Sequence, residues 1–410
     1  MNIEDKNILR ECTSCQVCGA ICPKEAIHIE LNKDGFYRPR IIKEKCIDCG
    51  ICVKSCYKYD EQIDTTTEDK LKDIPVYAAY VKEDIVLSNT TSGGVADILC
   101  KSLIEQRYTC VGVTYDKEQD IAVNSIATTK EDTDAFRGSK YIQSYTYTAF
   151  KKLLGKKTEG KYAVFGTPCH IYALDSHLRR IKNREQFLLI DIFCHGCPSL
   201  TIWKKYVKEL HNNTHGETLD QIKFRSKYRG WGNFCVSAEK NNKTIYAGKK
   251  INDAFYTLFF SNLALNDSCS DCKLRSTFEY TDIRLGDFWG KAYDMNHTGV
   301  SVVVPVSESG KKVFEQIKLQ LNINEHQHQD YLPYQSYGKA YTFNSQRREK
   351  LLSLINDEKA ELKEAISYYY QTQPLTVKIK RHIKNLILLM PNGVISVFKK
   401  LYHIINNIFS

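Results

Sequence analysis

The chain has 410 residues, of which 42% are hydrophobic and 26% are charged, and these proportions exclude a wholly disordered polypeptide. This length predicts two or three domains with at least one sizeable core. The formal net charge of +10 comes from cations spread along the chain, without a helix-turn-helix, zinc-finger or RNA-binding signature, so we expect no nucleic-acid partner.

The first residues and the cysteine content indicate the compartment. Residues 1–6 contain no apolar segment like that of a secretion signal, and no later stretch approaches the ~20 apolar residues that a membrane span requires. We therefore expect a cytoplasmic protein, in which the 16 cysteines stay reduced and do not form a disulfide framework. A cytosolic chain this rich in cysteine usually binds metal.

Two four-cysteine runs of the same C-x2-C-x2-C-x3-C spacing open the chain. Pro23 follows the first run, and Tyr57 follows the second, where proline is usual. In such runs the first three thiolates bind one 4Fe–4S cluster, and the fourth reaches the cluster of the other run. The first predicted cluster is therefore bound by Cys12, Cys15, Cys18 and Cys56, and the second by Cys46, Cys49, Cys52 and Cys22.

This segment resembles bacterial two-cluster ferredoxins over residues 10–58, and we assign residues 1–63 to such a domain. Strand-like segments at 26–31 and 36–41 flank an Asn-Lys-Asp-Gly turn and predict a hairpin. The alternative, a pair of zinc sites, fits less well because zinc favours two separated C-x2-C pairs. The exchange of proline for Tyr57 is expected to affect loop rigidity more than ligation.

A second domain is expected to start near Pro75, after an acidic, threonine-rich linker at residues 60–73. Residues 76–81 predict a strand, and Ser92-Gly93-Gly94 precede a helix with Val95, Ile98, Leu99 and Leu103 on one face. Free backbone NH groups at such a turn can hold a phosphate, with a plain Ser/Thr N-cap as the alternative. The loop at 137–144 mixes glycine, hydroxyls, cations and an aromatic ring, and it suits a phosphorylated planar cofactor.

Residues 162–165 predict a strand that ends in Gly166-Thr167-Pro168-Cys169-His170, followed by a helix from Ile171 and a strand at 187–193. This β-α-β order favours an α/β sheet. Both strands finish at a cysteine, Cys169 and Cys194, and ligand sites collect at strand ends. The pair Cys269 and Cys272 predicts a third metal site, whereas Cys100, Cys110 and Cys235 are expected to be buried small hydrophobes.

Over residues 75–315 the chain resembles the beta-subunit family of coenzyme F-420 (deazaflavin) hydrogenases and dehydrogenases. The motifs that carry the resemblance, in order, are Ser92-Gly93-Gly94, Gly138-Ser139-Lys140-Tyr141, Gly166-Thr167-Pro168-Cys169, Cys194-His195-Gly196, Cys269 with Cys272, Gly286-Asp287-Phe288-Trp289-Gly290, and Gly299-Val300-Ser301. The resemblance implies FAD and a third 4Fe–4S cluster. The implied flavin contacts are Ser92, Gly93, Gly94, Gly138, Ser139, Lys140, Tyr141, Gly166, Thr167 and Pro168, and the implied cluster ligands are Cys169, Cys194, Cys269 and Cys272.

Several alternatives stay open at this point. A zinc ion could bind Cys194 and Cys197 together with Cys269 and Cys272, and Cys194 with Cys197 could instead be a redox dithiol. The histidines that follow Cys169 and Cys194 either tune the cluster and relay protons or simply pack. In the tail, basic and apolar residues at 376–384 and 393–410 could lie on an anionic membrane surface or pack on protein.

The predicted fold class is therefore α+β / α/β. We expect a two-cluster ferredoxin-type domain at 1–63, a mixed α/β flavin and iron–sulfur domain in two parts at 75–155 and 156–345, and a helical basic tail at 346–410. The predicted function is an iron–sulfur flavoprotein oxidoreductase that passes electrons between 4Fe–4S clusters and FAD. Its partner would be a redox protein, an organic substrate, or a deazaflavin or nicotinamide-type coenzyme. The alternative is a non-catalytic electron-transfer subunit of a larger complex without flavin.

Overall fold

The computed structural model describes residues 2–4, 11–60, 62–154, 160–249, 252–379 and 381. Most of the basic tail on which the membrane prediction rests, residues 382–410, lies outside the described residues. The helical reading from Arg347 onward is confirmed by α12 (Ser345–Asn356) and α13 (Leu362–Gln371).

The N-terminal module consists of two short helices, α1 (Val17–Ala20) and α2 (Ile51–Lys54), and the antiparallel strands β1 (Ile27–Leu31) and β2 (Tyr37–Ile41). The predicted hairpin is confirmed. Its turn is held by the Asn32 side chain, which accepts hydrogen bonds from the backbone NH of Asp34 at 3.1 Å and of Phe36 at 2.9 Å. The asparagine therefore closes the loop that the sequence marked as a turn.

The duplication of the cysteine runs is also visible in the backbone. Ser14 and Asp48, each two residues after the first cysteine of its run, have φ values of 66° and 49°. Gln16 and Gly50, each four residues after that cysteine, have φ values of 61° and 73° and precede α1 and α2. Left-handed residues at matching positions let consecutive amide groups line a concave loop, the geometry that holds anionic clusters.

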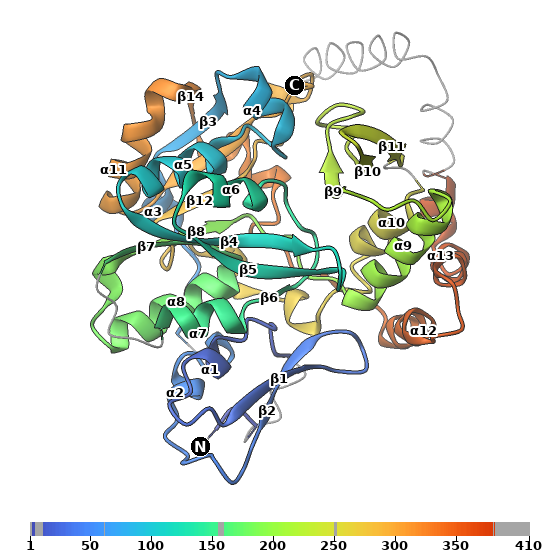
Figure 1. The fold of residues 1–410 in the computed structure, drawn as a ribbon, viewed down its shortest axis with the longest axis horizontal. Helices are drawn as coiled ribbons and strands as arrows, with labels where there is room; N and C mark the ends of the chain where they lie inside the picture. The colour runs from blue at the N-terminus through green and yellow to red at the C-terminus, as the bar shows by residue number, and fades with distance from the viewer. Residues whose placement is uncertain are drawn as a thin grey trace.

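The main domain is built on a nine-stranded sheet with the order β14-β3-β13-β12-β8-β7-β4-β5-β6 (Figure 1). Its strands are β3 (Val76–Val81), β4 (Tyr108–Asp116), β5 (Ile121–Ala127), β6 (Ser144–Tyr145), β7 (Lys161–Phe165), β8 (Phe187–Ile192), β12 (Ile283–Asp287), β13 (Ser301–Pro305) and β14 (Leu321–His326). The central strands β12, β8, β7 and β4 run parallel, whereas β13, β3 and β14 pair antiparallel at one edge. Strands from both sides of residue 155 thus share one sheet.

Helices cover both faces of this sheet (Figure 1). One face packs against α4 (Asp84–Asn89), α5 (Val95–Glu105), α6 (Lys130–Thr133) and α11 (Glu308–Ile317), and the short α3 (Glu68–Lys72) precedes β3. The other face packs against α7 (Tyr147–Leu154) and α8 (Pro168–Arg180), which separate the sheet from the N-terminal module. Because successive strand residues face opposite layers, Cys110 lies under α5 and Val111 lies under α8.

The helix α8 begins at Pro168, three residues before the predicted start at Ile171. Thr167 precedes it in extended conformation and Pro168 occupies its first turn, a position that proline favours. Cys100, Cys110 and Cys235 are buried, as predicted for small hydrophobic side chains.

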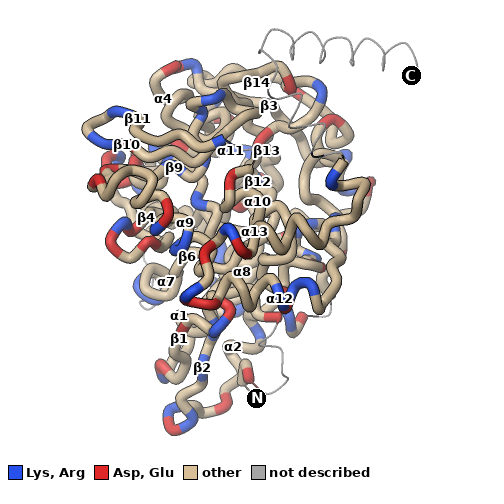
Figure 2. Tube along the Cα trace, turned by 90° about the vertical axis from the view of Figure 1, so that its right-hand side faces the viewer, with Lys and Arg blue, Asp and Glu red and all other residues tan. Residues whose placement is uncertain are grey.

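A second lobe lies beside the sheet, on the right in Figure 1. It contains a three-stranded sheet of β9 (Gln221–Ser226), β10 (Cys235–Lys240) and β11 (Lys243–Ala247), with α9 (Leu200–Asn213), α10 (Ala254–Phe260), α12 and α13. The rings of Trp203 and Phe224 stack in its core with centroids 3.8 Å apart. In the view of Figure 2, basic and acidic residues are interspersed along the trace, as the sequence indicated.

Candidate functional site

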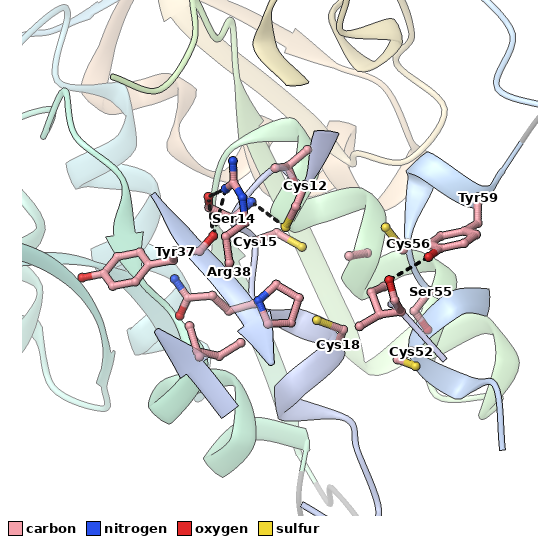
Figure 3. Close-up of a pocket in the computed structure, with 16 residues that line it drawn as sticks. Cys12, Ser14, Cys15, Cys18, Tyr37, Arg38, Cys52, Ser55, Cys56 and Tyr59 are labelled. Carbon is pink, nitrogen blue, oxygen red and sulfur yellow. Dashed lines mark hydrogen bonds between the residues drawn. The ribbon is translucent and has the colours of Figure 1, made fainter. Parts of the chain in front are cut away.

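The first cysteine-lined pocket lies inside the N-terminal module and has a volume of about 510 Å³. It brings together Cys12, Cys15 and Cys18 of the first run and Cys56 of the second, whose sulfur atoms face a common space in Figure 3. Cys18 lies on α1, and Cys56 follows α2. The fold therefore gathers the crossed set of thiols that the spacing predicted.

A second pocket of about 360 Å³ adjoins the first. Its lining includes Cys46, Cys49 and Cys52 of the second run and Cys22 of the first. Cys52 also lines the first pocket, so the two cavities share a wall. Cys49 is the exposed thiol of this set, which places the second pocket nearer to the surface.

The chemistry of these pockets fits iron–sulfur clusters. Burial raises the pKa of Cys15 to about 11, and burial together with neighbouring thiols raises the pKa of Cys18. Such thiols hold their protons at neutral pH unless a metal replaces them, since coordination deprotonates a thiol. The backbone NH of Ser14 points at the Cys12 sulfur, 3.4 Å away, and that of Ala26 at the Cys22 sulfur, 3.3 Å away. Amide donors of this kind stabilise metal-bound thiolates.

Within the described ranges, no three side chains of His, Cys, Asp or Glu meet closely enough to hold a single metal ion. The thiolates of a 4Fe–4S cube bind different iron atoms, so a cube does not require three donors on one ion.

A third group of cysteines lies at the carboxyl ends of the central parallel strands. Cys169 follows β7 in the first turn of α8, Cys194 follows β8, and Cys269 and Cys272 come from the loop before β12. Each of these thiols interacts electrostatically with others of the set, and burial raises the pKa of Cys194 to about 12. Cys197 joins the group through Cys269 and Cys194. The structure therefore brings together all four predicted ligands and a fifth thiol.

Arg275 ties this third group together. Its buried guanidinium donates hydrogen bonds to the carbonyl oxygens of Cys194 at 3.3 Å, His195 at 2.7 Å and Cys269 at 2.5 Å. The arginine thus fixes the loop after β8 to the loop before β12 and places a positive charge beside the thiols. A cation in this position offsets the negative charge of metal-bound thiolates.

The two histidines beside these cysteines are neutral at pH 7. Burial lowers the pKa of both His170 and His195 to about 4. His195 bonds through Nε2 to Asn262 Oδ1 at 2.8 Å and through Nδ1 to the Tyr341 hydroxyl at 3.0 Å, and the ring of His170 packs on Phe150. These satisfied, packed rings favour the packing interpretation.

The third group adjoins the first pocket. The Cys15 thiol lies near enough to Cys169 to help raise the pKa of the Cys169 thiol, and α8 packs against α1. The three sulfur-rich sites therefore follow one another from the exposed Cys49 into the main domain.

A large cleft of about 3050 Å³ opens between the main sheet and the second lobe. Of the predicted flavin contacts, Gly138, Ser139 and Lys140 line it, next to Thr91. The amide of Gly93 is already bonded to Ser301 Oγ at 3.0 Å. A side chain at this glycine would place its Cβ 2.2 Å from the carbonyl oxygen of residue 79, so close backbone approach explains the glycine.

The remaining predicted flavin contacts do not line the cleft. Ser92 and Gly94 lie directly beside it, and Tyr141 lies behind its wall, where its hydroxyl accepts a hydrogen bond from Arg225 at 3.2 Å. The turn Gly166–Pro168 leads into α8 instead, where the Thr167 hydroxyl is 3.1 Å from the Cys169 sulfur. This turn therefore belongs to the third cysteine group.

Two cations of the cleft were missed by the sequence analysis. The Arg225 side chain is 1% exposed; its Nη1 pairs with Asp287 and Tyr141, while Nε and Nη2 have no partner among the described groups. Lys227 donates through Nζ to the carbonyl oxygens of Leu87 and Ser92, each at 2.6 Å, and burial lowers its pKa to about 7. Their sequence signal is a pair of cations two positions apart, Arg225 on β9 and Lys227 just after it, a pattern that is common at solvated strand ends.

None of the helices formed by the described residues combines the length and apolar character needed to traverse a bilayer.

Comparisons with known proteins match two separate segments of the chain. Residues 11–60 match the family model of the 4Fe-4S dicluster domain, and residues 159–330 match that of the carboxyl terminus of the coenzyme F420 hydrogenase/dehydrogenase beta subunit. No curated protein matches the chain. A chain of the F420-reducing NiFe hydrogenase complex from Methanosarcina barkeri is similar in structure, with 15% identity, a TM-score of 0.45, and coverage of 72% of this chain and 90% of that chain. The protein thus joins an N-terminal 4Fe–4S dicluster domain to a segment, residues 159–330, that matches the carboxyl-terminal region of coenzyme F420 hydrogenase/dehydrogenase beta subunits.

Proposed function

We propose that the protein is an iron–sulfur flavoprotein oxidoreductase. The N-terminal module binds two 4Fe–4S clusters in the crossed arrangement, and Cys169, Cys194, Cys269 and Cys272 bind a third cluster. The cleft binds FAD beside an organic substrate or a deazaflavin or nicotinamide-type coenzyme. FAD, when bound, converts two single-electron transfers into one two-electron exchange.

The observation that carries this proposal is the continuous order of the sulfur-rich sites. The second pocket shares Cys52 with the first, and the first adjoins the third group through Cys15 and Cys169. The exposed Cys49 marks the end at which a redox partner protein exchanges single electrons. The residues between the sites exclude water and hold each site against the next.

The assignment of Cys169 rather than Cys197 to the third cluster rests on position. Cys169 lies in the first turn of the 13-residue helix α8, where the helix dipole favours a thiolate. It also lies near Cys15, a thiol of the first pocket, whose charge acts on it. Cys197 has neither feature, and its sulfur lies 4.0 Å from the carbonyl oxygen of Pro198.

The cleft supports a phosphorylated cofactor through its cations. Arg225 holds two unpartnered nitrogens in an almost fully buried guanidinium, and a buried donor left unsatisfied costs about 1–3 kcal/mol. An anionic ligand would satisfy these donors, and Lys227 and the Gly138 loop would add charge and amide groups. The guanidinium also lies over the ring of Trp289, 5.1 Å from its centroid, while the aromatic side chains that line the cleft are Tyr115, Phe224 and Tyr228.

The test is anaerobic purification with iron, acid-labile sulfide, zinc and FAD measured per chain. Three clusters predict about 12 iron atoms with matching sulfide. The double variant Cys269→Ser, Cys272→Ser is expected to lose about four iron atoms, whereas Cys235→Ser, a matched change at a buried thiol outside the three sites, keeps all of them.

Iron and sulfide for two clusters only, without FAD, would refute the reductase and leave the electron-transfer subunit. Zinc bound to the main domain would refute the third cluster.

A further inference from the structure

The side chain of Tyr57 extends from the N-terminal module into the main domain. It follows Cys56 directly, where the two-cluster pattern usually has proline, and begins the short 3₁₀ turn Tyr57–Tyr59. Its side chain is 5% exposed and packs in an apolar cluster that also contains Cys169 and Cys272. The residue that follows a ligand of the first cluster therefore shares an apolar cluster with two ligands of the third.

The Tyr57 hydroxyl is a buried donor beside sulfur. It has no oxygen or nitrogen partner among the described residues. The thiols of Cys272, Cys169 and Cys269 lie near it, and the Cys272 side chain interacts with it as a hydrogen-bond partner. Buried hydroxyls in folded proteins almost always find an acceptor. The sulfur atoms of the third group are the acceptors within reach.

We propose that the Tyr57 hydroxyl donates a hydrogen bond to a sulfur of the cluster held by Cys169, Cys194, Cys269 and Cys272, and thereby raises the reduction potential of that cluster. This inference rests on the third cluster of the proposed function. A reduced cluster carries one more negative charge than an oxidised one, so a donor to its sulfur stabilises the reduced form more. Tyr57 is a positioning residue in this sense, since it acts through the cluster.

Two neighbouring tyrosines, Tyr172 and Tyr280, serve as a comparison because they have a packing role in the same cluster. The Tyr57 ring meets the Tyr172 ring edge-on with centroids 6.0 Å apart, and the Tyr172 hydroxyl is satisfied by Asp60. Tyr280 packs on Tyr172 at 4.6 Å, and no cysteine contributes to the shift of its pKa. Packing alone would be kept by phenylalanine at position 57, so the hydroxyl is the group to test.

The test compares Tyr57→Phe with the matched control Tyr280→Phe in the full-length, anaerobically prepared protein. Iron and sulfide are measured first, and the cluster signals are then followed by electron paramagnetic resonance during a redox titration. The signal of the third cluster is the one missing from the double variant at Cys269 and Cys272. In Tyr57→Phe, the ratio of reduced to oxidised third cluster at a fixed potential is expected to fall about tenfold. This corresponds to a shift of the reduction potential of that cluster by about 59 mV to a lower value. Tyr280→Phe is expected to leave it unchanged.

A second measurement does not depend on the reduction potential of the third cluster. In deuterated buffer, the reduced third cluster is expected to show a coupled exchangeable deuteron that Tyr57→Phe removes. If about 12 iron atoms are present and neither the potential nor this deuteron changes, the inference is wrong while the proposed function stands. If only about eight are present, the third cluster and the inference both fall.

Discussion

Gln16 is expected to hold the N-terminal module against the main domain, and the variant Gln16→Ala tests this. The residue is 3% exposed. Its Oε1 accepts hydrogen bonds from the backbone NH of Thr146 at 2.9 Å and of Tyr147 at 3.0 Å, and its Nε2 donates to the carbonyl oxygen of Ser144 at 2.9 Å. Since α7 begins at Tyr147, a side chain of one module caps a helix of the other.

The expected loss of local stability in Gln16→Ala follows from the backbone groups that lose their hydrogen-bond partner. Two amides at the start of α7 and one carbonyl become unsatisfied in Gln16→Ala, and each buried group costs about 1–3 kcal/mol unless water reaches it. Loss of a helix cap alone costs about 1 kcal/mol. We take about 2 kcal/mol for the local opening of this turn, which corresponds to roughly 30-fold faster exchange of the amides.

The assay is hydrogen exchange with mass spectrometry on a peptide that covers residues 144–154 of the intact, cluster-bound protein. Gln16→Glu keeps an acceptor for both amides and is expected to exchange more slowly than Gln16→Ala. Gln119→Ala, at an exposed glutamine bonded only to the nearby Asp116, is the matched control and should match the parent protein. Unchanged exchange of this peptide in Gln16→Ala would refute the capping role.

Three further results are expected. Because of cross-ligation, Cys56→Ser should remove the cluster of the first run and Cys22→Ser that of the second, each with a loss of about four iron atoms by iron analysis. FAD affinity, followed by flavin fluorescence, should weaken as pH rises through about 7, because Lys140 and Lys227, which both line the cleft, are charged below their lowered pKa of about 7 and neutral above it; Lys227→Met should reduce this slope, and its combination with Lys140→Met should flatten it. Gly93→Ala should lower the urea midpoint severely through its backbone clash, whereas Gly138→Ala, at φ +82° with open space around its Cβ, should cost only about 1 kcal/mol.

Prediction from the sequence was most accurate where the spacing of residues along the chain determines the geometry of a site. Three cysteines spaced by two residues can only wrap around one centre, so the pockets could be assigned before the fold was known. The β-α-β order likewise placed Cys169 and Cys194 at the ends of two strands, and the carboxyl ends of parallel β7 and β8 lie at the same edge of the sheet. Local rules were sufficient in both cases.

Prediction was weakest where partners come from distant parts of the chain. Arg225 is functional in our proposal because Asp287, 62 positions later, orients it beside the cleft. The Gly93 turn has the composition of a phosphate loop, yet its amide is bonded to Ser301, more than 200 positions away. The sequence analysis interpreted Tyr57 as a change in loop rigidity, because no residue close to it in the sequence indicates the thiols among which its side chain packs. Such long-range pairings have no periodic or spacing signal.

The contacts between the modules argue for an electron path set by the fold rather than by movement of the N-terminal module. Asn266 donates through Nδ2 to the carbonyl oxygen of Cys12 at 2.9 Å and accepts a hydrogen bond from Arg38 at 3.2 Å, all within a buried interface. Three residues later the same segment provides Cys269. One short segment therefore holds a cysteine of the first pocket and supplies one to the third group. Swinging the module away would exchange these protein hydrogen bonds for bonds to water, at a net cost of about 1 kcal/mol each. Under the proposed function, a docked module of this kind exchanges electrons with a redox partner where it is exposed, at Cys49.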